Sequence, residues 1–207
     1  MNAAAESDLA RLSRITDSVF AVVITLLAYR VRLPGREALA APSLAALTPF
    51  LADLGALAIS FLVASLYWLA HWAVFRRMHG VDFRFVTLHF AFLGGMVLLP
   101  LTTSLMSAAA GERIGAFAYS VNLFFLAAMQ TLFRAHARRL EPQAFGGAVP
   151  LLLTSALLTT LFGIATVLSL TEPAAARWVW WASLLTPFVE RRWGLARAGR
   201  EVRPQPS

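Results

Sequence analysis

The chain has 207 residues, of which 58% are hydrophobic and only 14% are charged, and its mean hydropathy is +0.66. A water-soluble domain has about a quarter of its residues charged, and a chain of this length has too little interior to bury such an apolar excess. Composition therefore excludes a water-soluble globule and predicts an all-α integral membrane protein. No cysteine is present, which excludes disulfides, thiolate metal sites and cysteine nucleophiles.

Uncharged runs mark the predicted membrane-spanning helices, because crossing a core of about 30 Å takes about 20 residues. Two short runs, Ser18–Tyr29 and Trp178–Val189, reach that length only with their charged flanks, Arg14–Leu33 and Ala174–Arg191. The four long runs are Leu54–Phe75, Phe85–Gly111, Ile114–Phe133 and Pro142–Thr171. The sequence therefore predicts six transmembrane helices, with four as the alternative.

The net charge is +7, and all 18 basic residues are arginine. With six spans, one side of the membrane holds Arg11, Arg14, Arg76, Arg77, Arg84, Arg134, Arg138, Arg139, Arg191, Arg192, Arg197, Arg200 and Arg203. The other side holds Arg30, Arg32, Arg36, Arg113 and Arg177. Since cytoplasmic loops carry the excess of basic residues, both termini are predicted to be cytoplasmic, in a multi-pass protein of the cell (plasma) membrane.

The six helices leave no room for a soluble domain. We expect a cytoplasmic segment at residues 1–10, a transmembrane domain at 11–193 and a disordered cytoplasmic tail at 194–207. The longest connection, Pro34–Pro42, is expected to be partly helical. Because the arginines lie between apolar runs rather than in one patch, they indicate contact with anionic lipid headgroups and not with nucleic acid.

The first predicted helix is unusually polar for a lipid-facing segment. It carries Asp17, which at the bilayer centre would cost about 2.5–3.5 kcal/mol, so this carboxylate should lie near an interface with a partner. Arg11, Arg14 and a histidine or tryptophan of another helix are the candidates. Asp17 either simply anchors the helix, or the helix faces protein or water instead of lipid.

Helical spacing places an apolar stripe on the same helix. Val22, Leu26 and Tyr29 recur at i, i+4 and i+7, with Thr25 beside them. In several copies around an axis, this stripe would form narrow apolar rings and one hydroxyl ring, which can exclude water and replace part of a cation's hydration shell. The alternatives are that the stripe is a packing surface between helices and that Thr25 bonds the backbone carbonyl four residues back.

Three motifs in order resemble the transmembrane protein 175 family. Residues 11–27 read RLSRITDSVFAVVITLL, similar to the family's R-x-x-x-F-S-D signature followed by F-A-x-x-I-T-L-L. Residues 59–75 contain ISF and YWLAHWAVF, which resemble I-S-F and Y-W-x-x-H-H-x-x-F. Residues 99–103, LPLTT, are similar to an L-P-F-P-T turn. The family consists of potassium channels, and its prokaryotic members carry one six-helix repeat.

The resemblance implies a homotetramer whose central pore is lined by the first helix and conducts K⁺. It implies that Val22, Leu26 and Tyr29 occupy the hydrophobic constriction rings. Thr25 matches the threonine whose hydroxyl ring is linked to potassium preference in prokaryotic members. With a single repeat, the chain is expected to associate with itself to close a pore.

The resemblance also implies a network that ties the first helix to its neighbours. Arg11, Thr16 and Asp17 match the signature residues, with Trp68 and His71 as the expected partners.

The chain departs from the family pattern at the pore mouth. Arg30 replaces the acidic residue usual after the stripe, and Tyr29 replaces a ring leucine. Four arginines near a mouth would repel cations by about 1 kcal/mol per close pair in water, so the sequence predicts a potassium-selective or only weakly selective channel.

Other functions are weighed against the channel. A proton-coupled transporter would use Asp17 and His71 as a relay, although a structural hydrogen bond of His71 is the simpler interpretation, and a non-conducting membrane scaffold is the third possibility. The four histidines form no ligand pair at i, i+3 or i, i+4, and no phosphate loop, paired catalytic carboxylates or nucleophile elbow occurs. We therefore expect no metal site, no cofactor and no enzymatic activity.

Overall fold

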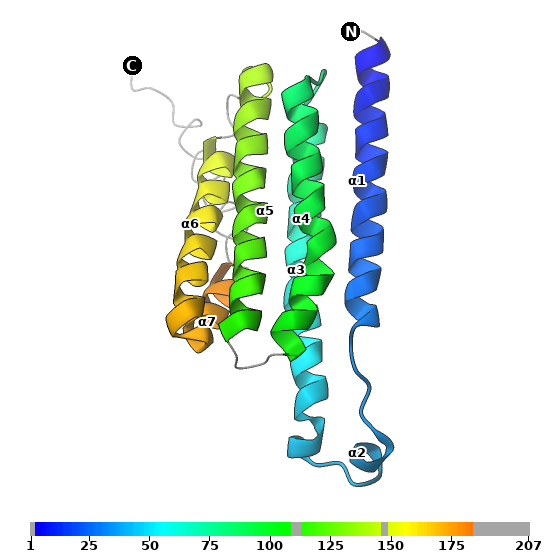
Figure 1. Ribbon diagram of the computed structural model, residues 1–207. Helices are drawn as coiled ribbons and strands as arrows, with labels where there is room; N and C mark the ends of the chain where they lie inside the picture. The colour runs from blue at the N-terminus through cyan, green and yellow to red at the C-terminus, as the bar shows by residue number, and fades with distance from the viewer. Residues whose placement is uncertain (1–2, 109–112, 146–148, 184–207) are drawn as a thin grey trace, which may run out of the picture.

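The structure is a computed structural model, and it describes residues 3–108, 113–145 and 149–183. These residues form a bundle of antiparallel helices with no strand among them (Figure 1). The helices are α1 (Ala3–Tyr29), α2 (Arg36–Ala40), α3 (Leu44–Phe75), α4 (Phe83–Ala108), α5 (Arg113–Leu140), α6 (Val149–Thr171) and α7 (Pro173–Ser183).

Five helices of the described part are long and apolar enough to cross a membrane. The candidate spans are Ser7–Tyr29, Leu44–Phe75, Phe83–Ala108, Arg113–Leu140 and Leu152–Thr171. The sixth predicted span begins within α7, and its second half lies outside the described residues, as does the tail at 194–207. The all-helical membrane fold is confirmed, and the sixth span remains a prediction.

Three of the predicted boundaries are wrong. α1 begins at Ala3 and α3 at Leu44, each about ten residues before the predicted span, and residues 142–145 form a turn rather than the start of a helix. Charged residues end a stretch that lipid can surround, but they do not end a helix whose terminal turns lie in water. Asp53 consequently lies inside α3, where the sequence pattern had placed a boundary.

The connection between the first two spans is partly helical, as expected. It contains α2, and its last residues lead to Ser43, whose side-chain oxygen accepts a hydrogen bond from the Ala46 N–H at 3.2 Å. This is an N-cap that satisfies one of the free donors at the start of α3.

The helices pack in two groups joined through α4. α1 lies at one edge of the bundle, against α3 and α4, whereas α5 packs against α4, α6 and α7 (Figure 1). α4 and α5 approach closely at Gly95, where an added Cβ would lie 2.8 Å from the Phe125 ring and 2.9 Å from Leu126. A small residue is needed there because larger ones would separate the two backbones.

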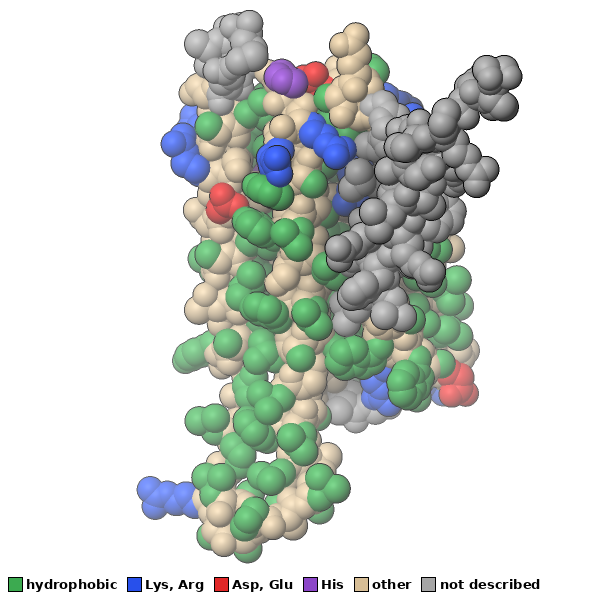
Figure 2. Space-filling model, turned by 180° about the vertical axis from the view of Figure 1, so that it is seen from behind, with side chains coloured by type: hydrophobic (Ala, Val, Ile, Leu, Met, Phe, Trp, Pro, Cys, Tyr) green, Lys and Arg blue, Asp and Glu red, His purple; other side chains and the backbone are tan. Residues whose placement is uncertain are grey.

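Apolar side chains fill the interior and also cover much of the outside. The main buried cluster runs from Phe20, Val23 and Leu27 of α1 to Trp180 of α7. Figure 2 shows hydrophobic side chains over the middle of one face, with basic side chains gathered toward the end that holds the start of α1. An apolar outer band with charges near the ends is what a lipid-embedded bundle requires.

Candidate pore helix

α1 has two faces of similar residue type and opposite environment. Val23 and Leu27 are 1% and 2% exposed and pack against α3 and α4, whereas Val22, Leu26 and Tyr29 are 58%, 46% and 86% exposed. The stripe predicted from helical spacing therefore points away from the single-chain bundle. Within one chain, the described residues leave it available to lipid, water or another copy.

Thr25 lies on this exposed face. Its hydroxyl donates to the Ala21 carbonyl at 2.7 Å, which is the backbone bond that the sequence left open as an alternative role. This bond uses the proton of the hydroxyl but leaves the oxygen able to accept a further interaction. The same side chain can therefore make this bond and still present oxygen to a cation.

Two of the signature residues, Asp17 and Thr16, are bonded to α3 and α4. The Trp68 indole N–H of α3 donates to Asp17 Oδ1 at 2.8 Å, which agrees with a tryptophan partner for this exposed carboxylate. Thr16 is buried, donates to the Leu12 carbonyl at 2.8 Å, and lies 3.1 Å from His89 Nε2 of α4. Two helices therefore fix α1 through side-chain hydrogen bonds.

His71 and Arg11 do not take part in the expected network. His71 is fully buried and stacks between Phe92, with ring centroids 4.1 Å apart, and Phe133, at 4.8 Å. Neither of its ring nitrogens has a hydrogen-bond partner among the described residues, so it is not bonded to Asp17. Arg11 is exposed and makes no hydrogen bond or ion pair within the described ranges.

The sequence did not indicate that His89 contacts the first helix. The spacing of one helix does not say which neighbour it packs against, because lipid-facing and protein-facing sides of a membrane helix are equally apolar. The sequence offered only a polar residue, Thr16, in an otherwise apolar helix, which can bond a side chain of another helix.

The chain just after α1 is fixed by a second polar cluster. Asp53 of α3 is 4% exposed, and its carboxylate accepts the Arg32 backbone N–H at 3.1 Å and the Arg32 Nε and Nη2 at 2.9 and 3.0 Å. Ser107 of α4 also donates to this carboxylate. The hydrogen bond to Asp53 raises the pKa of Arg32, which therefore stays charged. The pair clamps the chain just after α1 to α3 and α4.

Arg30 lies beside this cluster at the end of α1. It is exposed and lines, with Arg32 and Asp53, a cavity of about 220 Å³ whose other walls include Ser104 and Ser107. The sequence predicted a positively charged pore mouth at Arg30 but did not assign Asp53 of α3, which supplies a compensating negative charge. No group of three or more metal-ligating side chains occurs among the described residues.

A bundle with five candidate spans, and an edge helix held at its middle and just after its end while an apolar stripe faces outward, defines a multi-pass membrane protein. The sequence model described as "Endosomal/lysosomal potassium channel TMEM175" matches residues 11–100. The fold matches the crystal structure of a lysosomal potassium-selective channel TMEM175 homolog from Chamaesiphon minutus, with a TM-score of 0.77 and 18% identity over 89% of this chain and 98% of that one. No curated protein matches the chain.

The match to the TMEM175 family model supports the resemblance seen in the sequence motifs, and the structural match supports the fold. The family model and the crystal structure are both described as potassium channels, which supports a channel rather than an enzyme. The matched segment, residues 11–100, covers α1 to most of α4, which are the helices that carry the motifs and the polar contacts described above.

Proposed function

We propose that the chain conducts K⁺ passively through the central pore of a homotetramer lined by α1. The observation that carries the proposal is the exposed stripe of Val22, Leu26 and Tyr29 on a helix whose opposite face is fully packed. A pore lined by one helix per chain needs several copies, and four would bring four such stripes to one axis. No cofactor is required for passive conduction, with K⁺ as the permeant ion.

The stripe would form three constriction rings and one hydroxyl ring. Rings of apolar side chains close a narrow pore by excluding water, and an oxygen ring can replace part of a cation's hydration shell. The Thr25 hydroxyl already donates to Ala21, so its oxygen is oriented as an acceptor, which suits a cation rather than an anion. Thr25 is the proposed source of ion preference.

The supports of α1 would act as positioning residues. Asp17 with Trp68 and Thr16 with His89 hold the first half of the helix, while His71 fills the aromatic core behind it. We place Arg11 in the same group, as a charge at the membrane surface. We also propose a sixth span at Ala174–Arg191, cytoplasmic termini and residence in the cell membrane.

The decisive test is flux in liposomes that hold the purified chain and a potassium gradient. Flux above that of empty vesicles is expected, together with a tetramer mass in detergent. A tetramer without flux would identify a scaffold, and a strict monomer would defeat the pore. Saturable flux that depends on a pH gradient would instead identify a proton-coupled transporter using Asp17 and His71.

The role of Thr25 is tested by Thr25→Val. The permeability ratio of K⁺ to Na⁺ should fall, because a methyl ring offers no oxygen to the ion. Thr87→Val is the matched control, since Thr87 is an exposed threonine on α4 that makes the same bond to the carbonyl four residues back, at 2.8 Å to Phe83. An unchanged ratio in Thr25→Val would remove Thr25 from this role.

A further inference from the structure

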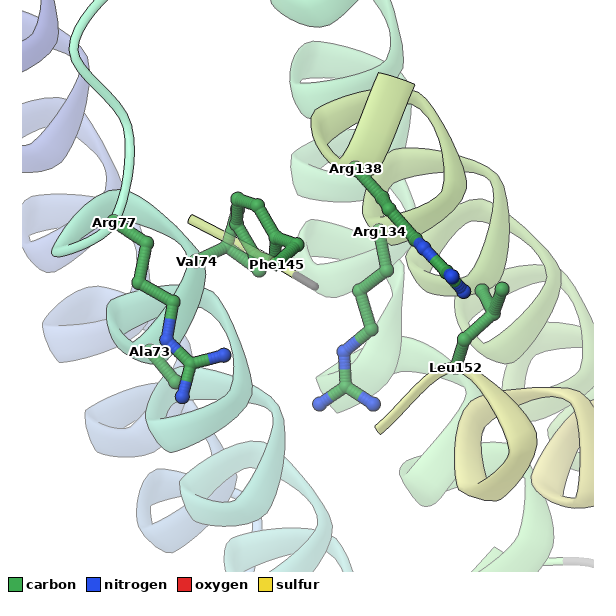
Figure 3. Close-up of a pocket in the computed structure, with 7 residues that line it drawn as sticks. All are labelled: Ala73, Val74, Arg77, Arg134, Arg138, Phe145 and Leu152. Atoms are coloured by element: carbon green, nitrogen blue, oxygen red, sulfur yellow. The ribbon is translucent and has the colours of Figure 1, made fainter. Parts of the chain in front are cut away.

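A small pocket opens where α3 and α5 end and α6 begins. It lies at the end of the bundle that holds the start of α1, away from the stripe of the proposed pore (Figure 1). Its described lining consists of three arginines and four apolar residues: Arg77, Arg134, Arg138, Ala73, Val74, Phe145 and Leu152 (Figure 3).

The arginines come from two elements that face each other across the pocket. Arg77 follows the end of α3, and Arg134 and Arg138 are four residues apart on one face of α5. Figure 3 shows the Arg77 and Arg134 side chains on opposite walls and Arg138 reaching toward Leu152. Arg134 is only 8% exposed. Arg77 and Arg138 bring two like charges to one pocket, and an anion between them would offset their repulsion.

The guanidinium groups of Arg77 and Arg138 are available to such an anion. Arg77 lies over the Phe145 ring at 5.7 Å, which orients the side chain without using its N–H donors. No carboxylate lines the described pocket, and neither Arg77 nor Arg138 forms an ion pair within the described residues. A guanidinium donates in a planar fork that matches two oxygens of one phosphate.

The depth of the pocket indicates which anion reaches it. Arg77 comes two residues after α3 ends at Phe75, Arg138 comes two residues before α5 ends at Leu140, and Leu152 is the first residue of the next candidate span. The pocket therefore lies at the level where spans leave the hydrocarbon, which is the headgroup region. The positive-inside rule predicts that this end is cytoplasmic.

The apolar walls favour a lipid over a free ion. Val74 and Phe145 belong to a buried cluster and meet the arginines at the pocket. The enclosed space is only about 20 Å³, room for about one water-sized group, so phosphate oxygens would enter while the rest of the molecule stays at the mouth. A headgroup followed by a glycerol backbone and acyl chains fits a site that is basic at one side and apolar at the other.

We propose that this pocket binds the phosphate of an anionic phospholipid, with Arg77 and Arg138 as its ligands. The site is separate from the pore of the proposed function and does not depend on it. A free phosphate shares the same chemistry, so the experiment must distinguish the two sources.

The test is native mass spectrometry of the full chain in detergent with added phosphatidylglycerol or phosphatidylcholine of equal acyl chains. The wild type should bind phosphatidylglycerol preferentially. Arg77→Gln with Arg138→Gln should weaken that binding by about 10–30-fold and leave phosphatidylcholine binding unchanged. Arg76→Gln with Arg139→Gln is the matched control, since Arg76 lies over the Trp72 ring at 4.4 Å and Arg139 is exposed outside the pocket lining.

Three outcomes would overturn the proposal. These are no lipid preference in the wild type, an equal loss in the control variant, or displacement of phosphatidylglycerol by millimolar inorganic phosphate. Should the double glutamine variant fail to fold, Arg77→Lys with Arg138→Lys keeps the charges but removes the planar forks. It should bind phosphatidylglycerol with intermediate affinity, and wild-type affinity in that variant would exclude bidentate recognition.

Discussion

The two faces of α1 differ in environment far more than in residue type. Val22 and Val23 are neighbours, as are Leu26 and Leu27, yet the first of each pair is about half exposed and the second is buried. Because successive residues of a helix point about 100° apart, one step along the chain moves a side chain from the bundle core to the outer stripe. Identical residues can therefore serve stability on one face and, by our proposal, conduction on the other.

The largest effect should separate Leu27→Ala from Leu26→Ala. Leu27 is 2% exposed within the main cluster, so its truncation should lower stability by about 2–4 kcal/mol through lost packing. Leu26→Ala should change stability by less than about 0.5 kcal/mol but should increase K⁺ flux, because the ring becomes wider.

Thermal unfolding in one detergent, paired with liposome flux, measures both quantities. Leu69→Ala is the control for flux, since Leu69 is an equally exposed leucine of α3 (48%). Equal destabilisation by Leu26→Ala and Leu27→Ala would mean that both faces of α1 contribute equally to the packing that stabilises the bundle.

A smaller loss is expected from Thr16→Val on the buried face. The substitution keeps the shape of the side chain but removes the hydroxyl that bonds His89, and leaving a buried ring nitrogen without a partner costs about 1–3 kcal/mol. Thr16→Ser should restore most of the unfolding temperature. A Thr16→Val protein as stable as the wild type would show that this bond does not hold α1.

Features of single helices were predictable from the sequence, whereas contacts between helices were not. The spans were predictable from uncharged runs, since lipid excludes charge and the arithmetic of length is simple. The stripe of Val22, Leu26 and Tyr29 was predictable from helical spacing alone. Both depend on one segment at a time, although three span boundaries and the environment of the stripe were not determined by the sequence.

The contacts between helices were not predictable in the same way. His89 holds the middle of α1 and Asp53 the chain just after it, but neither lies near α1 in sequence, and nothing in an apolar helix says which side meets protein. Asp53 was overlooked because a charged residue was treated as the limit of a span. In the structure, Asp53 lies inside α3 and its carboxylate is paired with Arg32. His71 was assigned from a motif and stacks on aromatic rings instead.

Asp53→Asn tests whether the chain just after α1 must be bound to α3 for the two faces of α1 to keep their different environments. The variant loses the charge that three donors of Arg32 recognise. The cost should be about 1–2 kcal/mol, below that of a fully buried pair, because the Arg32 side chain is 61% exposed and stays hydrated.

The chain has no cysteine, so a spin label on Tyr29→Cys reports this region alone. The label should become more mobile in the Asp53→Asn background and should be unaffected by Glu37→Gln, a substitution in α2 outside the clamp. Unchanged mobility in Asp53→Asn would mean that the pair does not position the pore helix.

Arg30→Gln examines the exposed end of the stripe. Removing a ring of positive charge should raise K⁺ flux by about 2–5-fold at low salt, and the difference should shrink at 1 M salt, where the screening length falls to about 3 Å. Arg113→Gln is the control, because Arg113 is an exposed arginine at the start of α5, at the same end of the bundle. A gain that is independent of salt would exclude an electrostatic origin.

The smallest effect should come from a polar contact that does not involve α1. Asp82 caps α4, accepting the Phe85 N–H at 2.7 Å, and lies 2.9 Å from His136 Nε2. Burial alone would raise the pKa of Asp82, but the bonds from Phe85 and His136 outweigh it, so the pKa is lowered on folding. This carboxylate therefore stabilises the fold above its unfolded pKa of about 3.9, and the contribution is lost as pH falls through the folded value.

The unfolding temperature of the wild type should exceed that of Asp82→Asn at pH 6, and the gap should close below about pH 4. A gap that stays constant from pH 6 to pH 3 would assign the difference to the shape of the cap rather than to its charge. K⁺ flux and ion preference should be unchanged in Asp82→Asn, because the contact lies outside α1 and its supports. If they changed together with stability, loss of packing anywhere in the bundle would be enough to alter conduction, and the outer stripe of α1 would have no special role.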